Sequence, residues 1–254
     1  MMKTLGDLYD TLDALAPFSA ARPTDNCGIL VGGRAMLLRR VLLALDVTAD
    51  VIEEAATTGA DCILAHHPVI YEPIRAISER NPVYLAARSN IALMAAHTNL
   101  DVAPGGVNDT YLQAIGLNKT GPLPGTDGCA ALAECPPTLS DLSALAERVK
   151  CCTGLPAVRV LDAGRVIRTA AVCCGGGASF LDCAIQSGAD VLISGDFRHH
   201  HAVAAQNAGI SLIDAGHYET ERLVLEPLAK RLAERMPEVA FAVAKADRPF
   251  FQYR

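Results

Sequence analysis

Two stretches of the chain, 129 residues apart, begin with the same three residues and continue with apolar ones: residues 59–66 read GADCILAH and residues 188–195 read GADVLISG. Each is a short apolar run between a turn-like start and a polar or glycine end, which is typical of a strand buried inside a sheet. A second pair of stretches, residues 90–97 and 209–216, is similar at an offset of 119. The chain is therefore predicted to be a duplicated α/β protein.

The predicted repeats are residues 1–124 and 125–254, and each alternates apolar strand-like runs with helical patterns. Residues 116–137 contain four prolines and four glycines and are predicted to connect the two halves. Gly59 is placed as the glycine that ends a helix, and Asn81-Pro82 as a helix start.

The following elements are predicted, in chain order. Helices are expected over residues 4–16, 49–58, 81–89, 108–115 with a cap from Asn108-Asp-Thr110, 140–152 starting at Ser140, a segment after 177 ending near 187, 199–208 and 219–235. Strands are expected over residues 28–32, 40–46, 62–65, 91–95, 157–161, 166–173, 190–194, 210–213 and 239–244.

Composition excludes several classes of function. Hydrophobic residues make up 51% of the chain and Trp is absent, so an aliphatic core of helices packed on buried sheets is expected. A net charge of −6 lacks the basic face that nucleic-acid binding needs. The N-terminus reads as an amphipathic helix, not a signal peptide, and no apolar run reaches the roughly 18 residues that span a bilayer. The nine cysteines show no C-x-x-C spacing, so reduced thiols in a cytoplasmic protein without membrane segments are expected.

Two adjacent histidines, His66 and His67, follow a predicted strand and precede Pro68, which prevents the strand from continuing. Because side chains alternate along a strand, the two imidazoles should point to different sides. They can then bind two separate ions, or one can bind an ion while the other supports a ligand.

Two further pairs, each four residues apart, lie at predicted strand ends. His217 and Glu221 should share one face of a helix, whereas His97 and Asp101 precede a Pro-Gly-Gly sequence and are expected on a turn. Ligand groups of open α/β sheets gather beyond the carboxyl ends of strands. Nitrogen and carboxylate ligands without thiolates fit zinc, manganese, iron, cobalt or nickel. Five or six ligands exceed the need of one catalytic zinc, so two divalent ions are predicted, at a site between the repeats.

Three other features leave alternatives open. Asp25-Asn26 can supply an oxygen that supports a metal ligand, or can form a turn. Residues 199–201 are three histidines that read as an exposed helix start, and of this region Asp196 and His200 are placed near the site. The glycines at 175–177 can cradle a phosphate or form a tight turn between a strand and a helix.

These elements, in this order, resemble the Nif-three-like family of dinuclear metal-centre hexameric proteins, whose members are often labelled homologues of a type-2 GTP cyclohydrolase I. The matching stretches are residues 25–32, 44–48, 66–71, 97–101, 105–109, 195–196 and 216–221, reading DNCGILVG, ALDVT, HHPVIY, HTNLD, GGVND, GD and GHYETE. This chain departs from the family at Thr24, where a Trp is usual, and in its richer glycine loop.

The resemblance implies two intertwined α/β repeats with mixed sheets and a ring-shaped homohexamer. By motif match it implies five metal ligands: His66, His67, Asp101, His217 and Glu221. In the expected assignment Glu221 bridges the ions, His66 and His217 favour one ion, and His67 and Asp101 favour the other. His97 is expected beside them, as a ligand or as support for one.

The leading hypothesis is a metal-dependent hydrolase acting on a small molecule such as a nucleotide, a phosphoester or a cyclic amide. His97 or His200 is the candidate proton shuttle. The alternative is a non-catalytic metal-binding scaffold, metal handler or regulatory partner. Imidazoles outside the ligand set favour the enzyme, because a storage protein would not need them.

Overall fold

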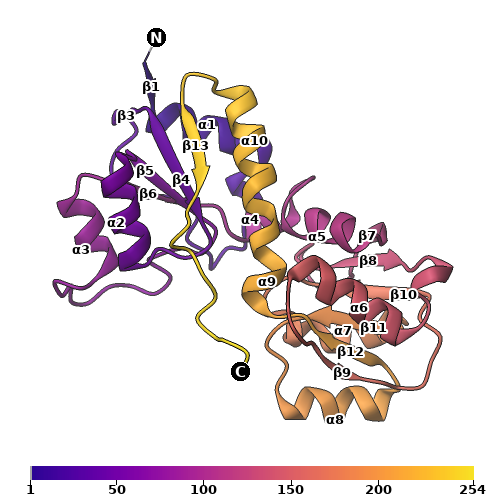
Figure 1. The fold of residues 1–254 in the computed structure, drawn as a ribbon. Helices are drawn as coiled ribbons and strands as arrows, with labels where there is room; N and C mark the ends of the chain where they lie inside the picture. The colour runs from indigo at the N-terminus through magenta and orange to yellow at the C-terminus, as the bar shows by residue number, and fades with distance from the viewer. Residues whose placement is uncertain (1) are drawn as a thin grey trace. The chain divides into compact units, whose positions relative to one another are not determined.

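The computed structural model describes residues 2–254 and divides into two compact units. Unit 1 is the chain up to Pro104 together with Val224–Phe250, and unit 2 is Gly105–Leu223 together with Phe251–Arg254. In Figure 1, unit 1 combines the indigo and purple N-terminal part with the yellow C-terminal helix and strand. The units therefore divide the chain elsewhere than the predicted repeats, whose boundary at 124/125 stays a prediction.

Unit 1 is built on a mixed five-stranded sheet of order β13-β4-β5-β6-β2. Its pairs are parallel, except that β2 runs antiparallel to β6. The strands are β2 (Gly28–Val31), β4 (Arg40–Ala44), β5 (Cys62–Ala65), β6 (Ala92–Ala95) and β13 (Ala240–Val243), with a separate pair β1 (Lys3–Thr4) and β3 (Leu37–Leu38). The helices are α1 (Leu5–Leu15), η1 (Phe18–Ala20), α2 (Ala49–Thr58), α3 (Pro82–Arg88), α4 (Thr98–Val102) and α10 (Leu225–Arg235).

Helices cover both faces of this sheet, which is why β5 and β6 are apolar throughout. Leu42, Ile63 and Leu93 point to one face and pack with buried residues of α2 and α3. On the other side, α1 contacts α10, and α10 contacts β4 and β13 (Figure 1). The predicted ends hold for α2, which Thr48 caps through Val51 N–H and Gly59 ends at φ +68°.

Unit 2 is built on a mixed six-stranded sheet of order β7-β8-β10-β11-β12-β9. Only the pairs β10–β11 and β11–β12 are parallel. The strands are β7 (Asn118–Pro122), β8 (Ala131–Glu134), β9 (Arg159–Leu161), β10 (Thr169–Val172), β11 (Val191–Ser194) and β12 (Ser211–Asp214). The helices are α5 (Val107–Ile115), η2 (Pro137–Leu139), α6 (Leu142–Thr153), η3 (Gly177–Phe180), α7 (Leu181–Gln186), α8 (His199–Ala208) and α9 (His217–Glu221), and η4 (Arg222–Val224) follows.

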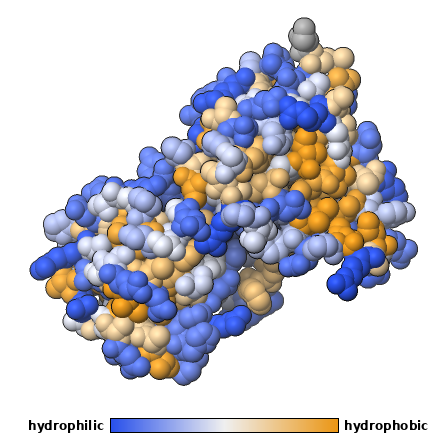
Figure 2. Space-filling model, turned by 180° about the vertical axis from the view of Figure 1, so that it is seen from behind, coloured by the Kyte–Doolittle hydropathy of each residue, from blue (hydrophilic) through white to orange (hydrophobic). Residues whose placement is uncertain are grey.

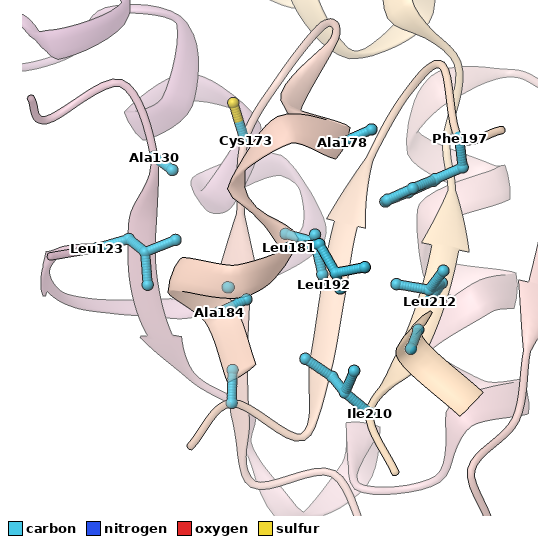
Figure 3. Packing of buried hydrophobic residues seen from close by; sticks show 13 residues of the cluster. Leu123, Ala130, Cys173, Ala178, Leu181, Ala184, Leu192, Phe197, Ile210 and Leu212 are labelled. Carbon is cyan, nitrogen blue, oxygen red and sulfur yellow. The ribbon is translucent and has the colours of Figure 1, made fainter. Parts of the chain in front are cut away.

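One face of the second sheet packs against α7 and α8 (Figure 3). Leu181 and Ala184 of α7 lie over Leu192 and Leu212 of the strands, and Phe197 closes the cluster beyond the end of β11. Val172, Val191 and Ile193 are fully buried as well, so the opposite face is covered too. The six-residue helix α7 is thus held by its apolar face rather than by intrinsic helix propensity.

The two sheets share an order of four strands: β4-β5-β6-β2 in unit 1 and β10-β11-β12-β9 in unit 2. In each, three parallel strands are followed by one antiparallel edge strand. The aspartates of the repeated GAD sequence also act alike. Asp61 accepts hydrogen bonds from Arg39 N and Arg40 N, and Asp190 accepts them from Arg168 N and Thr169 N. The predicted mixed α/β fold is confirmed, and these parallels support the duplication.

Four sequence predictions need correction. The segment 116–137 is more than a connection, because it forms the antiparallel pair β7 and β8, and β8 joins the sheet through β10. Asn108 does not cap α5, whose N-cap is Gly106, but is buried. The cap of α6 is Asp141 and not Ser140. The single helix predicted over 219–235 is interrupted between α9 and α10 by the 3-10 turn η4.

Within residues 2–254, none of the helices is long and apolar enough to cross a membrane. On the face seen in Figure 2, apolar side chains form orange patches among hydrophilic ones. Tyr71 and Ile77 of unit 1 are among the exposed large apolar side chains, with 57% and 53% of their surface accessible.

Candidate metal centre

In unit 1, the three parallel strands β4, β5 and β6 all end at the same edge of the sheet. Asp46 follows β4, His66 and His67 follow β5 directly, and His97 follows β6. The strand registers therefore place these polar side chains together, where open α/β sheets present their ligand groups.

His66 and His67 lean toward opposite neighbours. The His66 Nδ1 lies 2.9 Å from the carbonyl oxygen of Ala96, beyond β6, and the His67 Nδ1 lies 2.9 Å from Asp46 Oδ1, beyond β4. A carbonyl oxygen only accepts hydrogen bonds, so Nδ1 of His66 carries the proton and Nε2 presents a lone pair. The rings nevertheless stay close, with centroids 5.0 Å apart.

His97 is held by Asp25, whose carboxylate oxygens lie 2.9 and 3.0 Å from the His97 Nδ1. Thr98 also donates to Asp25, from its amide at 3.1 Å and its hydroxyl at 2.6 Å. Burial raises the pKa of Asp25, but the hydrogen bonds from His97 and Thr98 outweigh it and hold that pKa well below its ordinary value. Of the two alternatives for Asp25-Asn26, the first is observed for Asp25, whose oxygens support the candidate ligand His97.

His66, His67 and His97 each offer one ring nitrogen. These three nitrogens lie within 4.8 Å of one another, a spacing at which they could hold a metal ion. A carboxylate joins them, because Asp101 Oδ1 lies 3.6 Å from the His66 Nε2. His97 and Asp101 are not on the predicted turn: His97 is the N-cap of α4 and Asp101 lies within that helix. As candidate ligands, unit 1 thus gathers three imidazoles and the carboxylate of Asp101, with Asp25 and Asp46 behind two of the imidazoles.

Unit 2 carries the other predicted pair at the end of β12. His217 opens α9, and its Nε2 lies 3.2 Å from Glu221 Oε2, so the predicted i, i+4 geometry is observed. The His217 Nδ1 lies 2.7 Å from Asp196 Oδ2, and Asp196 follows β11 in a left-handed backbone conformation at φ +61°. Glu221 is buried, with 4% of its surface accessible.

Gly175, three residues after the end of β10, leaves the space that Glu221 occupies. A Cβ at this position would overlap Glu221 Oε1 and would lie 3.1 Å from the His217 Nε2. Gly175 N–H donates to Thr220 Oγ1 and Gly177 N–H donates to Ser194 Oγ. Of the two readings of the glycine loop, the structure therefore shows the tight turn, with these amides bonded internally.

The sequence prediction missed Asp46, which orients His67. The available signal was a carboxylate directly after a parallel strand that neighbours the His-His strand. His200 lies on the exposed start of α8 and lines a pocket together with Asp196, which contacts His217.

The donor set fits a divalent transition metal. Imidazole nitrogens and carboxylate oxygens are ligands for zinc, manganese, iron, cobalt and nickel. In each of the four histidines, Nδ1 faces an oxygen of a carboxylate or carbonyl, the arrangement that metal-binding histidines show. The Nε2 atoms are then the nitrogens that would coordinate an ion.

Comparisons with known proteins show which family the chain is similar to. The family model described as Duf34/NIF3 (NGG1p interacting factor 3) matches residues 3–249. A Clostridium perfringens protein named GTP cyclohydrolase 1 type 2 homolog is 30% identical, over 98% of this chain and 99% of its own length. A Campylobacter jejuni protein of the same name is 32% identical, over 98% and 99%. The solved structure of Staphylococcus aureus hypothetical protein SA1388 has a TM-score of 0.89 at 27% identity and covers 100% of both chains.

Proposed function

This chain belongs to the Duf34/NIF3 family, and from that premise we propose that it is a metal-dependent hydrolase with two divalent ions. The observation that carries the proposal is the common orientation of four histidines, each with Nδ1 against an oxygen. Such orientation fixes the tautomer that a metal ligand needs, and an ordinary surface histidine has no need of it.

The proposed ligands are those expected from the sequence: His66, His67, Asp101, His217 and Glu221. Glu221 is proposed as the bridging carboxylate, His66 and His217 as ligands of one ion, and His67 and Asp101 as ligands of the other. The burial of Glu221 supports its role, because a buried carboxylate needs a positive partner. The metal remains one of zinc, manganese, iron, cobalt or nickel.

When bound, divalent ions supply a Lewis acid and lower the pKa of a water molecule toward neutrality. The chain itself supplies proton handling. Asp25 orients the His97 ring through its two short contacts with Nδ1, and His97 is the first proposed proton shuttle where its Nε2 is not a ligand. His200, exposed at the start of α8, is the second proposed shuttle.

The name that the relatives carry suggests a nucleotide, and we extend it to phosphoesters and cyclic amides as substrate candidates. The second candidate function is a non-catalytic metal-binding scaffold or regulatory partner. It would use the same ligands, so the observation that favours the enzyme is His200, an imidazole outside the ligand set in a pocket shared with Asp196.

The test starts with the metal content of the purified protein, measured by elemental analysis. Nucleotides, phosphoesters and cyclic amides are then screened with wild type, with Glu221→Gln, and with Glu226→Gln as a matched control on the exposed start of α10. We expect two ions in wild type and in the control, and turnover that only Glu221→Gln loses. If wild type binds two ions but its turnover does not exceed that of Glu221→Gln, the hydrolase is excluded and the scaffold remains. If wild type binds no metal under any condition, both functions are excluded.

A further inference from the structure

Unit 2 contains a second feature of chemical interest, a pair of adjacent hollows between β9, the end of β11 and the start of α8. One has a volume of about 700 Å³ and is lined by Arg159, Gly176, Ala178, Ser179, Asp196, Phe197, Arg198, His200 and His201. The other, of about 450 Å³, shares Arg159, Phe197 and Arg198 with it. Hollows of this size take small organic molecules.

The shared wall carries two cations. Arg159 is fixed in place, because it donates to the carbonyl oxygen of Phe197 at 2.9 Å and pairs with Asp214. Arg198 is the N-cap residue of α8 and is exposed. Two guanidinium groups on one wall form a recognition element suited to phosphate, which accepts paired hydrogen bonds from arginine.

The larger hollow is polar. His200 and His201 lie side by side in it, with ring centroids 4.0 Å apart, and Ser179 contributes a hydroxyl. Asp196 lines the same hollow and touches the His217 Nδ1 at 2.7 Å. A molecule held here would therefore lie next to the residue that orients His217.

The smaller hollow is more apolar. Val160, Leu161 and Leu212 line it, together with Asp214, which pairs with Arg159. Val160 exposes 52% of its surface on the edge strand β9. An exposed aliphatic wall beside two arginines suits a ligand that has both an anionic group and a flat apolar part.

We infer that this pair of hollows binds a phosphate monoester attached to a ring system, such as a nucleoside 5′-monophosphate group. Arg198 and Arg159 bind the phosphate, His200 donates to it, and the ring lies against Val160. The inference deepens the proposed function by naming a substrate class. That the bound molecule reacts rests on the proposed function, whereas its binding is independent of that function.

Calorimetric titration of the full chain with adenosine 5′-monophosphate, adenosine and inorganic phosphate tests the inference, with metal-loaded and metal-stripped protein. We expect the monophosphate to bind more tightly than either part alone, because both hollows are used. Arg198→Ala should weaken it about tenfold, since a charge-assisted hydrogen bond is lost. Arg168→Ala, an exposed arginine in the same unit outside the hollows, is the matched control and should bind as wild type does.

A second variant separates the two hollows. Val160→Glu should weaken adenosine 5′-monophosphate more than inorganic phosphate, because it alters the wall proposed for the ring. Equal losses for Arg198→Ala and Arg168→Ala, or no binding at millimolar ligand, would overturn the inference.

The hydrolase proposal can fail separately. If Glu221→Gln holds no metal but still binds the monophosphate, the pocket stands without the reaction. If Glu221→Gln loses the monophosphate as well, the metal ions hold the ligand and the pocket assignment is wrong.

Discussion

At the scale of single residues, the four histidines differ in what holds them. The His66 Nδ1 faces the Ala96 carbonyl, whereas His67, His97 and His217 face Asp46, Asp25 and Asp196. A backbone carbonyl fixes orientation without charge, while a carboxylate also makes the imidazole a stronger base. The three carboxylates are therefore separate points at which metal affinity can be changed without touching a ligand.

Replacing Asp46 tests this distinction. In Asp46→Asn the carboxylate that orients His67 becomes a neutral amide, so we expect metal affinity to fall by about 10- to 100-fold while the fold persists. A chelator competition titration measures the affinity. Asp50→Asn, an exposed position at the start of α2, is the control. Equal affinity in both variants would contradict the role given to Asp46.

Gly175 provides a second residue-scale prediction. Gly175→Ala adds a methyl group where Glu221 Oε1 lies, on a backbone at φ +66°, so we expect Glu221 to be displaced and metal affinity to be lost. Gly188→Ala is the matched control, because Gly188 has φ +70° but nothing within 4 Å of the added Cβ. It should lose about 1 kcal/mol of stability and keep its metal.

Urea denaturation and metal analysis on the two glycine variants separate strain from overlap. Strain alone predicts similar stability losses and unchanged metal content in both. Retention of full metal content by Gly175→Ala would show that Glu221 can move without consequence, against its proposed role.

At the scale of elements, the sequence predicted most strands and helices because their apolar periods and end signals agree. Helix α2 and strand β5 fall at the predicted residues, with Thr48, Gly59 and the His-His-Pro sequence marking their ends. Strand β7 has the sequence Asn118-Lys-Thr-Gly-Pro122, whose Gly and Pro signal a turn; only its pairing with β8 makes it a strand. Helix α4 was missed because five residues are too short for a period to show.

In helix α5, the role of Asn108 differs from the capping role that its sequence position suggested. Asn108 Nδ2 donates to the Cys129 carbonyl at 3.0 Å, and Asn108 Oδ1 accepts from Cys174 N–H at 3.0 Å. A sequence such as Asn-Asp-Thr also occurs away from helix starts. Here Asn108 is buried and bonds to other segments of the chain instead of capping the helix.

Asn108→Ala should therefore destabilise the protein by about 1–3 kcal/mol, because a buried amide hydrogen and a carbonyl each lose a partner. Urea denaturation gives the change in the free energy of unfolding. Gln113→Ala, an exposed position on the same helix, should change it by less than about 0.5 kcal/mol. Similar values for the two variants would mean that the Asn108 bonds contribute nothing net.

At the scale of the whole molecule, the sequence predicted the local geometry of the candidate site better than the contacts between distant parts of the chain. His217 and Glu221 are local, so their spacing alone gave the geometry. The partners Asp25 and Asp46 lie far along the chain from the histidines they hold, and only the order of strands in the sheet brings them there. A single sequence does not contain that order explicitly.

The homohexamer implied by the family resemblance remains a proposal, supported by the exposed apolar residues Tyr71, Ile77 and Tyr84 of unit 1. Size-exclusion chromatography with light scattering should give six times the chain mass of 26.7 kDa at micromolar concentration. A mass equal to one chain, unchanged by metal addition, would exclude the hexamer.

The return of Val224–Phe250 to unit 1 has a consequence for how the protein is made. Strand β13 is the parallel neighbour of β4, and α10 contacts both. Translation delivers these two elements only after all of Gly105–Leu223 has left the ribosome. The sheet of unit 1 is thus begun before unit 2 but completed only after Gly105–Leu223. Until then it has an open edge beside β4, with which a chaperone or a second nascent chain can pair.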